Sequence, residues 1–151
     1  MTMTHRIESL SYELAGLVDR VPDPDIDACV YLLTISAMTA TGLGDDPDLT
    51  RALTALREHG RVSGSTRLEM ATAVTQAEHR AFAAARRGDE PARDRAFFQA
   101  RALSCLAYAI GATTGGASLD RRDVVREVAY EATVALRGES GVVGVVTQYA
   151  G

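Results

Sequence analysis

The stretch that decides the fold is ACVYLLTISAMTATGLG, residues 28–44, which contains no charged side chain. A second charge-free stretch, ALSCLAYAIGATTGGASL at residues 102–119, lies in the other half of the chain. Both are marginal in length for a membrane span and are interrupted by Ser, Thr and Gly. A helix that is apolar around its whole circumference is normally covered by several neighbours. We therefore expect two interior helices around which the rest of the chain packs.

Amphipathic segments with helix start signals surround these two stretches. An apolar stripe at three- and four-residue spacing predicts a first helix over residues 5–20. Asp23 and Asp46 are each followed by a proline, which is typical of a helix N-terminus. Thr66 with Glu69 forms a capping-box pattern. Together with the interior stretches, these signals predict five further helices, over residues 24–41, 47–59, 67–87, 91–112 and 120–137.

The C-terminal segment differs in character from the rest of the chain. Its run GVVGVVTQY, residues 141–149, is rich in β-branched side chains, which favour extended structure. Such a run cannot form a sheet alone, so we expect it to pack on the helices or on a partner chain. The sequence thus predicts an all-α protein of 151 residues, a single-domain compact antiparallel bundle of five to six helices (residues 1–137) with a docked non-helical C-terminal tail (residues 138–151).

Charge is divided unevenly along the chain. Residues 1–50 hold two arginines and nine acidic residues (net −7), and residues 51–151 hold fourteen arginines and eleven acidic residues (net +3), which gives the total of −4. The two parts can attract each other within one chain or across a dimer. A negative total repels phosphates, so nucleic-acid binding is disfavoured. There is no lysine, and all 16 basic residues are arginines.

The most basic segment is residues 80–101, with six arginines against three acidic residues (net +3). It surrounds the predicted turn between two long helices. It can be a solvated hairpin tip or a surface for an anion or an acidic partner. The candidate contact residues are Arg80, Arg86, Arg87, Arg93 and Arg95.

Catalytic and metal-binding signatures are absent from the sequence. None of the three histidines follows a glutamate by three positions, as a di-iron bundle requires. There is no Cys-x-x-Cys pair, no Gly-x-Ser-x-Gly elbow and no Gly-Lys-Ser/Thr nucleotide loop. The two cysteines, Cys29 and Cys105, lie in apolar runs and are expected to be buried thiols. We therefore predict no catalytic residue, no metal and no cofactor.

Polar side chains close to the interior helices indicate a possible ligand pocket. Glu78 falls near the apolar side of its predicted helix, where it is either a boundary residue that reaches water or a buried carboxylate that needs a partner such as an arginine, Tyr31 or Tyr108. In an apolar pocket between the second, fourth and fifth predicted helices, a small set of polar side chains would form hydrogen bonds with the ligand. These candidates are Tyr31, Thr34, Glu78, Tyr108 and Thr113.

The alanine- and arginine-rich helical pair AEHRAFAAARRGDEPARDRAFFQARALSCLAYAI, residues 77–110, resembles small helical immunity proteins of bacterial toxin systems. The resemblance implies a role in binding another protein. It covers about residues 66–112 and contains no diagnostic motif, so no residue role is carried over from it.

Two functions follow as expectations. The first is a non-catalytic protein-interaction module of regulatory or immunity type, whose partner is another protein or a second copy of the chain. The alternative is a small-ligand-binding helical bundle, which would include the possibility of an enzyme. The chain opens directly into an amphipathic pattern, without a signal peptide, so we expect a cytoplasmic protein without a membrane partner.

Overall fold

The computed structural model describes residues 6–112 and 119–151. All regular structure in these residues is helical, which confirms the all-α class, and the number of α-helices is eight rather than five or six. They are α1 (Arg6–Leu10), α2 (Tyr12–Asp19), α3 (Ile26–Ala40), α4 (Pro47–His59), α5 (Gly64–Arg86), α6 (Glu90–Ala109), α7 (Arg121–Ala135) and α8 (Ser140–Val146), with a 3₁₀ turn, η1 (Asp23–Asp25), before α3.

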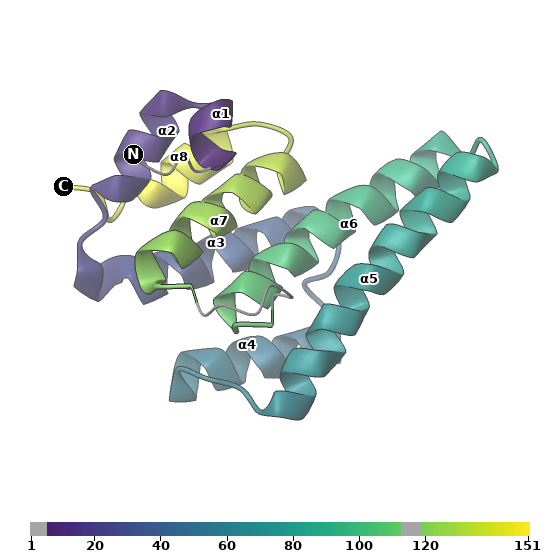
Figure 1. Ribbon diagram of the computed structural model, residues 1–151, viewed down its shortest axis with the longest axis horizontal. Coiled ribbons are helices and arrows are strands. Elements are labelled where there is room, and N and C mark those ends of the chain that lie inside the picture. Colours follow the sequence, from purple (N-terminus) through teal and green to yellow (C-terminus); the bar gives the residue numbers. More distant parts are fainter. Residues whose placement is uncertain (1–5, 113–118) are drawn as a thin grey trace.

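Seven of the eight described α-helices form two parts that share α6 (Figure 1), and α4 joins the core through Leu49, Ala52 and Leu53. In the first part, the body, α3 and α7 pack on each other and on α6, while α1 and α2 lie against α7 and α8 lies against α3. The second part is an antiparallel hairpin of α5 and α6, which projects away from the body (Figure 1). We call it the hairpin, and α6 runs from its tip into the body.

The charge-free stretches supply much of the core. Every residue from 102 to 107, in the second half of α6, is buried. In α3, Cys29, Leu33 and Ala37 are fully covered. Tyr31 and Leu32 are only partly buried, however, so α3 has one side that its neighbours leave open.

Several predicted helix starts are correct in position. The carboxylate of Asp46 accepts hydrogen bonds from the backbone of Asp48 and Leu49 at the start of α4, and Asp120 caps α7 in the same way. Two other predicted starts are wrong. Asp23 opens the 3₁₀ turn, and α3 follows it without a side-chain cap. The cap of α5 is Ser63 rather than Thr66, so α5 begins earlier than the capping-box pattern predicted.

Two larger predictions are also wrong. The helix expected over residues 5–20 is broken at Ser11, whose extended backbone (φ −164°, ψ 119°) lets its hydroxyl accept a hydrogen bond from the Leu14 amide. The C-terminal tail, expected to be non-helical, contains α8. Its Val142, Val145 and Val146 are buried at helical spacing, and this tertiary burial overrides their β propensity.

Part of the charge asymmetry is compensated within the chain. Three arginines near the start of α7 form ion pairs with three aspartates, which lie at the end of α2, in η1 and in the first turn of α3. The pairs are Arg121 with Asp27 (2.7 Å), Arg122 with Asp23 (2.6 Å) and Arg126 with Asp19 (2.9 Å). The acidic first third is thus held against the basic remainder of the same molecule.

Candidate functional site

A buried carboxylate lies where α1, α6 and α7 meet. Glu131 of α7 is only 2% exposed. Its Oε1 accepts a hydrogen bond from Arg6 Nη2 at 3.1 Å, and its Oε2 accepts one from Arg101 Nη1 at 3.2 Å. A buried charge is tolerated only when it is paired and hydrogen-bonded, and here two guanidinium groups share one carboxylate.

Further polar groups extend this centre into a cluster. Arg6 also donates from Nε to Glu127 (3.0 Å) and from Nη2 to the hydroxyl of Tyr108 (3.2 Å), and its guanidinium lies 4.1 Å from the ring centroid of Tyr130. On the other side, Arg101 forms an ion pair with Glu78 of α5 at 3.4 Å. The cluster therefore links α1, α5, α6 and α7. We call Arg6, Glu78, Arg101, Glu127 and Glu131 the charge cluster.

Burial raises the pKa of the phenol and thiol groups in and near the cluster. Desolvation raises the pKa of Tyr108, although the positive charge of Arg6 opposes the change. Cys105 is fully buried, and desolvation raises its pKa far above the usual range for a thiol. Desolvation also raises the pKa of Cys29 to about 11. Neither thiol is therefore activated as a nucleophile, because the reactive thiolate is scarce at neutral pH.

A shallow cleft of about 280 Å³ opens beside the charge cluster, between α5 and α6. Ala71, Val74 and Thr75 of α5 form one wall, and Ser104 and Tyr108 of α6 form the other. Arg6, Arg101 and Glu131 close its inner side. The charged groups pair with one another, and Nε of Arg101 is the one buried side-chain nitrogen or oxygen among the described residues without a hydrogen-bond partner.

The five predicted ligand residues do not form one pocket. Glu78 and Tyr108 both line the cleft. Tyr31 lines a different cavity, described below. Thr34 is fully buried and donates its hydroxyl hydrogen to the carbonyl of Val30 at 2.8 Å, so it is not available to a ligand. Thr113 lies outside the described residues.

The sequence interpretation missed the centre of the charge cluster. It left Glu78 open as a boundary residue that reaches water or a buried carboxylate. The side chain of Glu78 is 53% exposed, as a boundary residue would be, and the buried carboxylate is Glu131, which is 2% exposed. The available signal was the position of Glu131 between Val128 and Ala132, on the apolar side of its predicted helix. Its partners, Arg6 and Arg101, could not be identified from spacing because they lie on other helices.

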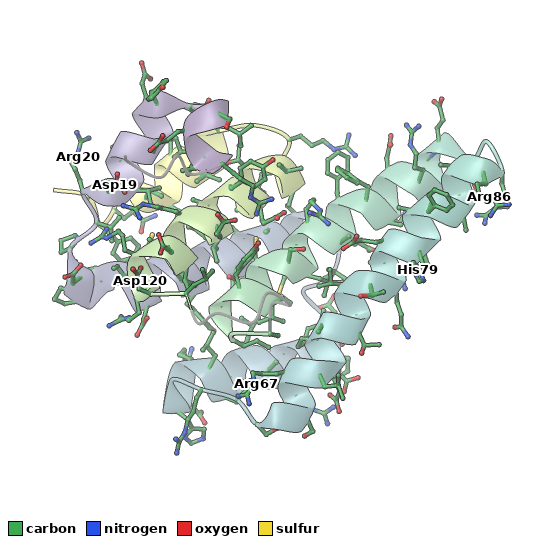
Figure 2. The ribbon with its side chains drawn as sticks, viewed as in Figure 1. Asp19, Arg20, Arg67, His79, Arg86 and Asp120 are labelled. Carbon is green, nitrogen blue, oxygen red and sulfur yellow. The ribbon has the colours of Figure 1, made fainter. Side chains whose placement is uncertain are left out.

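The predicted arginines do gather around the tip of the hairpin. Arg80, Arg86 and Arg87 lie in the last turns of α5 and its C-cap, while Arg93 and Arg95 lie in the first turns of α6. Figure 2 shows Arg86 at the far end of the hairpin and His79 on the outer side of α5. Arg93 pairs with Asp94 at 2.9 Å, and Arg87 approaches Asp89 to 4.0 Å. Within residues 6–112 and 119–151, Arg80, Arg86 and Arg95 pair with no carboxylate.

Two phenylalanines stand on one side of this tip. Glu78 and Arg101 bridge α5 and α6 on that side. Phe82 follows Glu78 by one turn and Phe97 precedes Arg101 by one turn, so in an antiparallel pair both rings lie one turn nearer the tip on the same side. Phe82 is 67% exposed and Phe97 is 43% exposed.

Arginines flank both rings. The guanidinium of Arg86 lies 5.9 Å from the ring centroid of Phe82, and that of Arg101 lies 5.7 Å from the centroid of Phe97. Arg93 precedes Phe97 by a further turn. We call the surface formed by Phe82, Arg86, Arg93 and Phe97 the tip face.

A second cavity, of about 630 Å³, lies on the open side of α3. Its walls come from α3, from the C-terminal end of α4, from the start of α7 and from the C-terminal segment after α8. We call it the α3–α4 cavity. Its lining includes Tyr31, Leu32, Leu56, Arg57, Val124 and Tyr149.

Among the described residues, no three His, Cys, Asp or Glu side chains are grouped so that they could hold a metal ion. None of the helices described is both long and apolar enough to cross a membrane. Comparisons of the chain with protein-family models, with curated proteins and with solved structures find no match. What the molecule does must therefore be argued from its own surfaces and cavities.

Proposed function

We propose that this chain is a non-catalytic protein-interaction module, and that the tip face of the hairpin binds an acidic protein partner. One observation carries the proposal. Of the 23 residues of α5, only Met70, Ala77 and Ala84 are buried, at a seven-residue spacing that places all three on one side of the helix. That side faces α6. Among the described helices, α6 makes the most extensive contact with α5, so most of the circumference of α5 is available for another molecule.

The composition of the tip face supports this role. Aromatic side chains and arginine are enriched in protein interfaces, where they often contribute most of the binding energy. Phe82 and Phe97 are both solvent-exposed, and an arginine guanidinium lies near each ring. Exposed aromatic side chains on one side of a hairpin are a suitable surface for another molecule to cover.

Charge indicates what kind of partner fits. Residues 80–101 have a net charge of +3. Asp19, Asp23 and Asp27 of the acidic first third pair with arginines of α7, which lowers the acidic charge that a second copy could offer to the tip. A separate protein with an acidic and partly apolar surface therefore matches the tip face better, and its encounter would be steered by charge. A cytoplasmic location is part of the proposal, because both cysteines are free thiols.

Affinity capture with matched variants tests the proposal. The wild-type chain, the double variant Phe82→Ser/Phe97→Ser and the control Tyr12→Ser would be used as baits in a lysate of the source organism. Tyr12 is an aromatic residue that is 81% exposed on α2, away from the hairpin. We expect an acidic protein to be retained by the wild type and by Tyr12→Ser, but not by the double variant. Raising NaCl from about 0.05 M to about 0.5 M should weaken its retention.

Two results would contradict this proposal. In the first, every protein captured by the wild type is also captured by the Phe82→Ser/Phe97→Ser variant. In the second, light scattering shows that the purified wild type is a dimer that the double variant converts to a monomer. The tip face would then be an interface between two copies rather than a surface for an acidic partner.

A further inference from the structure

The α3–α4 cavity has no role in the proposed partner binding, because it lies in the body and shares no residue with the tip face. Its volume of about 630 Å³ is within the range of roughly 300–1,000 Å³ that is usual for small-molecule sites. The cleft beside the charge cluster is smaller, at about 280 Å³, and the carboxylates and guanidinium groups that line it pair mostly with one another.

The walls of the cavity are mostly apolar. Ile26, Val30 and Leu32 of α3 face it, Leu56 contributes from α4, and Val124 contributes from α7. The sequence around α3 contains no charge from residue 28 to residue 44, and α6, α7 and α8 cover the other sides of the helix. The apolar side chains that remain on the open side would gain free energy if an apolar molecule covered them.

The charged groups at the rim of the cavity are unbalanced by one positive charge. Asp27 and Arg121 pair with each other at 2.7 Å, so their charges compensate. Arg57 also lines the cavity, and it makes no ion pair with any carboxylate in the described part of the chain. A guanidinium at the edge of an apolar cavity is well suited to bind a carboxylate, with two parallel hydrogen bonds.

Two phenol groups add hydrogen-bond capacity. Tyr31 and Tyr149 line the cavity from different elements, and both are partly buried. Neither hydroxyl forms a hydrogen bond to another described residue. A phenol can donate to a carboxylate oxygen or accept from a ligand hydroxyl. The cavity thus combines apolar walls with a few polar groups near its rim, which is the usual composition of a small-molecule site.

We infer that the α3–α4 cavity binds a small carboxylate with an apolar body, of the size of a medium-chain fatty acid or an arylacetic acid. The apolar body lies against Leu32, Leu56 and Val124. The carboxylate lies at Arg57, and Tyr31 and Tyr149, which line the same cavity, supply hydroxyl groups for further hydrogen bonds. This function is independent of the hairpin, so either proposal can fail while the other holds.

Calorimetric titration with decanoate and with decanol tests the apolar contacts and the charged contact of this inference separately. Both probes carry a ten-carbon chain, and only decanoate carries a charge. We expect saturable binding of decanoate at one site per chain. The amide signals that move in the NMR spectrum should belong to residues around Tyr31, Arg57 and Val124. Arg57→Gln should weaken decanoate binding by about tenfold and change decanol binding less than twofold, because only the charged contact is lost.

Matched variants control for indirect effects. Arg51→Gln removes an arginine from the same helix outside the cavity, and it should leave the affinity for decanoate unchanged. Ala28→Trp places a large ring at the cavity wall and should abolish binding of both probes. Ala83→Trp puts the same side chain on an exposed position of α5 and should have no effect. Circular dichroism would verify that each variant is folded.

Each of the following outcomes would overturn the inference. Decanoate binding that does not saturate, or NMR changes that map away from the cavity, would show that the cavity is not a site. Unchanged binding of both probes in folded Ala28→Trp would show the same. If Arg57→Gln weakens both probes equally or neither, the assignment of a carboxylate ligand fails.

Discussion

At the scale of single residues, the most informative feature is Glu131. Its carboxylate is 2% exposed and is shared by Arg6, which comes from the first helix, and Arg101, which comes from the hairpin. Moving charges out of water is costly, and the pairing offsets that cost only while all partners are present. The apolar neighbours of Glu131 in the sequence are compatible with burial. The arginines that make burial possible lie 125 and 30 residues away, so no local pattern could identify them.

Glu131→Ala should therefore destabilise the fold by about 3–5 kcal/mol, because it leaves Arg101 buried without its main counter-charge. Glu13→Ala, which removes an exposed carboxylate from α2, should change the free energy of unfolding by less than about 0.5 kcal/mol. Urea unfolding followed by circular dichroism measures both values. A loss below about 1 kcal/mol for Glu131→Ala would mean that the charge cluster does not hold the helices together.

A second residue-scale prediction concerns alkaline pH. Burial, with a contribution from Asp25, raises the pKa of Cys29 from 9.0 to about 11. The folded state therefore keeps its proton more strongly than the unfolded state. This contribution to stability is complete below pH 9 and is lost as the pH rises from about 9 to about 11, with a total of up to about 3 kcal/mol.

Comparison with Cys29→Ala isolates this effect from other groups that titrate at high pH. The free energy of unfolding would be measured for both chains at several pH values between 8 and 10.5. We expect the difference between wild type and variant to shrink or reverse as the pH rises. Curves that stay parallel over this range would show that the thiol ionises equally well in the folded and unfolded chains.

At the scale of helices, local chemistry predicted most segments and tertiary contacts decided the rest. The aspartate-and-proline signal at Asp46 gave the start of α4 correctly, because the cap is satisfied by neighbouring amides. The break at Ser11 was not predictable, since the apolar spacing continues through it from Ile7 to Leu14. The valines of α8 favour a strand when taken alone, and only the burial of Val142 and Val146 explains their helical conformation.

The start of α5 allows a direct test of which residue is the N-cap, Ser63 as in the structure or Thr66 as in the sequence pattern. The Ser63 hydroxyl accepts a hydrogen bond from the Thr66 amide at 3.2 Å, whereas the sequence pattern had indicated Thr66 as the cap. Ser63→Ala should cost about 1 kcal/mol, and Thr66→Ala should cost clearly less, because Thr66 is already inside the helix. Urea unfolding of the two variants measures the difference. The reverse order would restore Thr66 as the N-cap.

At the scale of the whole molecule, charge and burial are arranged differently in the two parts. In the body, the arginines of α7 neutralise aspartates around α2 and α3, so the uneven composition of the sequence becomes a set of internal contacts. In the hairpin, the basic residues surround an exposed tip. The sequence indicated both the asymmetry and the basic segment, but only the arrangement of the helices shows which charges are compensated within the chain.

This division predicts that two phenylalanines of the hairpin, Phe98 and Phe82, differ in their contribution to the free energy of unfolding. The ring of Phe98 is packed against Phe97, with a centroid separation of 5.2 Å, and lies 4.0 Å from the guanidinium of Arg137 beyond α7, so it joins the hairpin to the body. Phe82, in contrast, is 67% exposed on the tip face, and the arginine near its ring, Arg86, lies on the same helix. We expect Phe98→Ala to cost about 2 kcal/mol and Phe82→Ala less than about 0.5 kcal/mol.

Urea unfolding gives the two free energies, and hydrogen exchange locates the effect. Amides near the tip should exchange faster than those of α3 in the wild type, because few buried contacts oppose local opening there. Phe98→Ala should increase exchange along the first turns of α6, and Phe82→Ala should leave exchange in the body unchanged. If Phe82→Ala destabilises the isolated chain as much as Phe98→Ala does, then the tip face contributes to folding and its exposure cannot be assigned to partner binding.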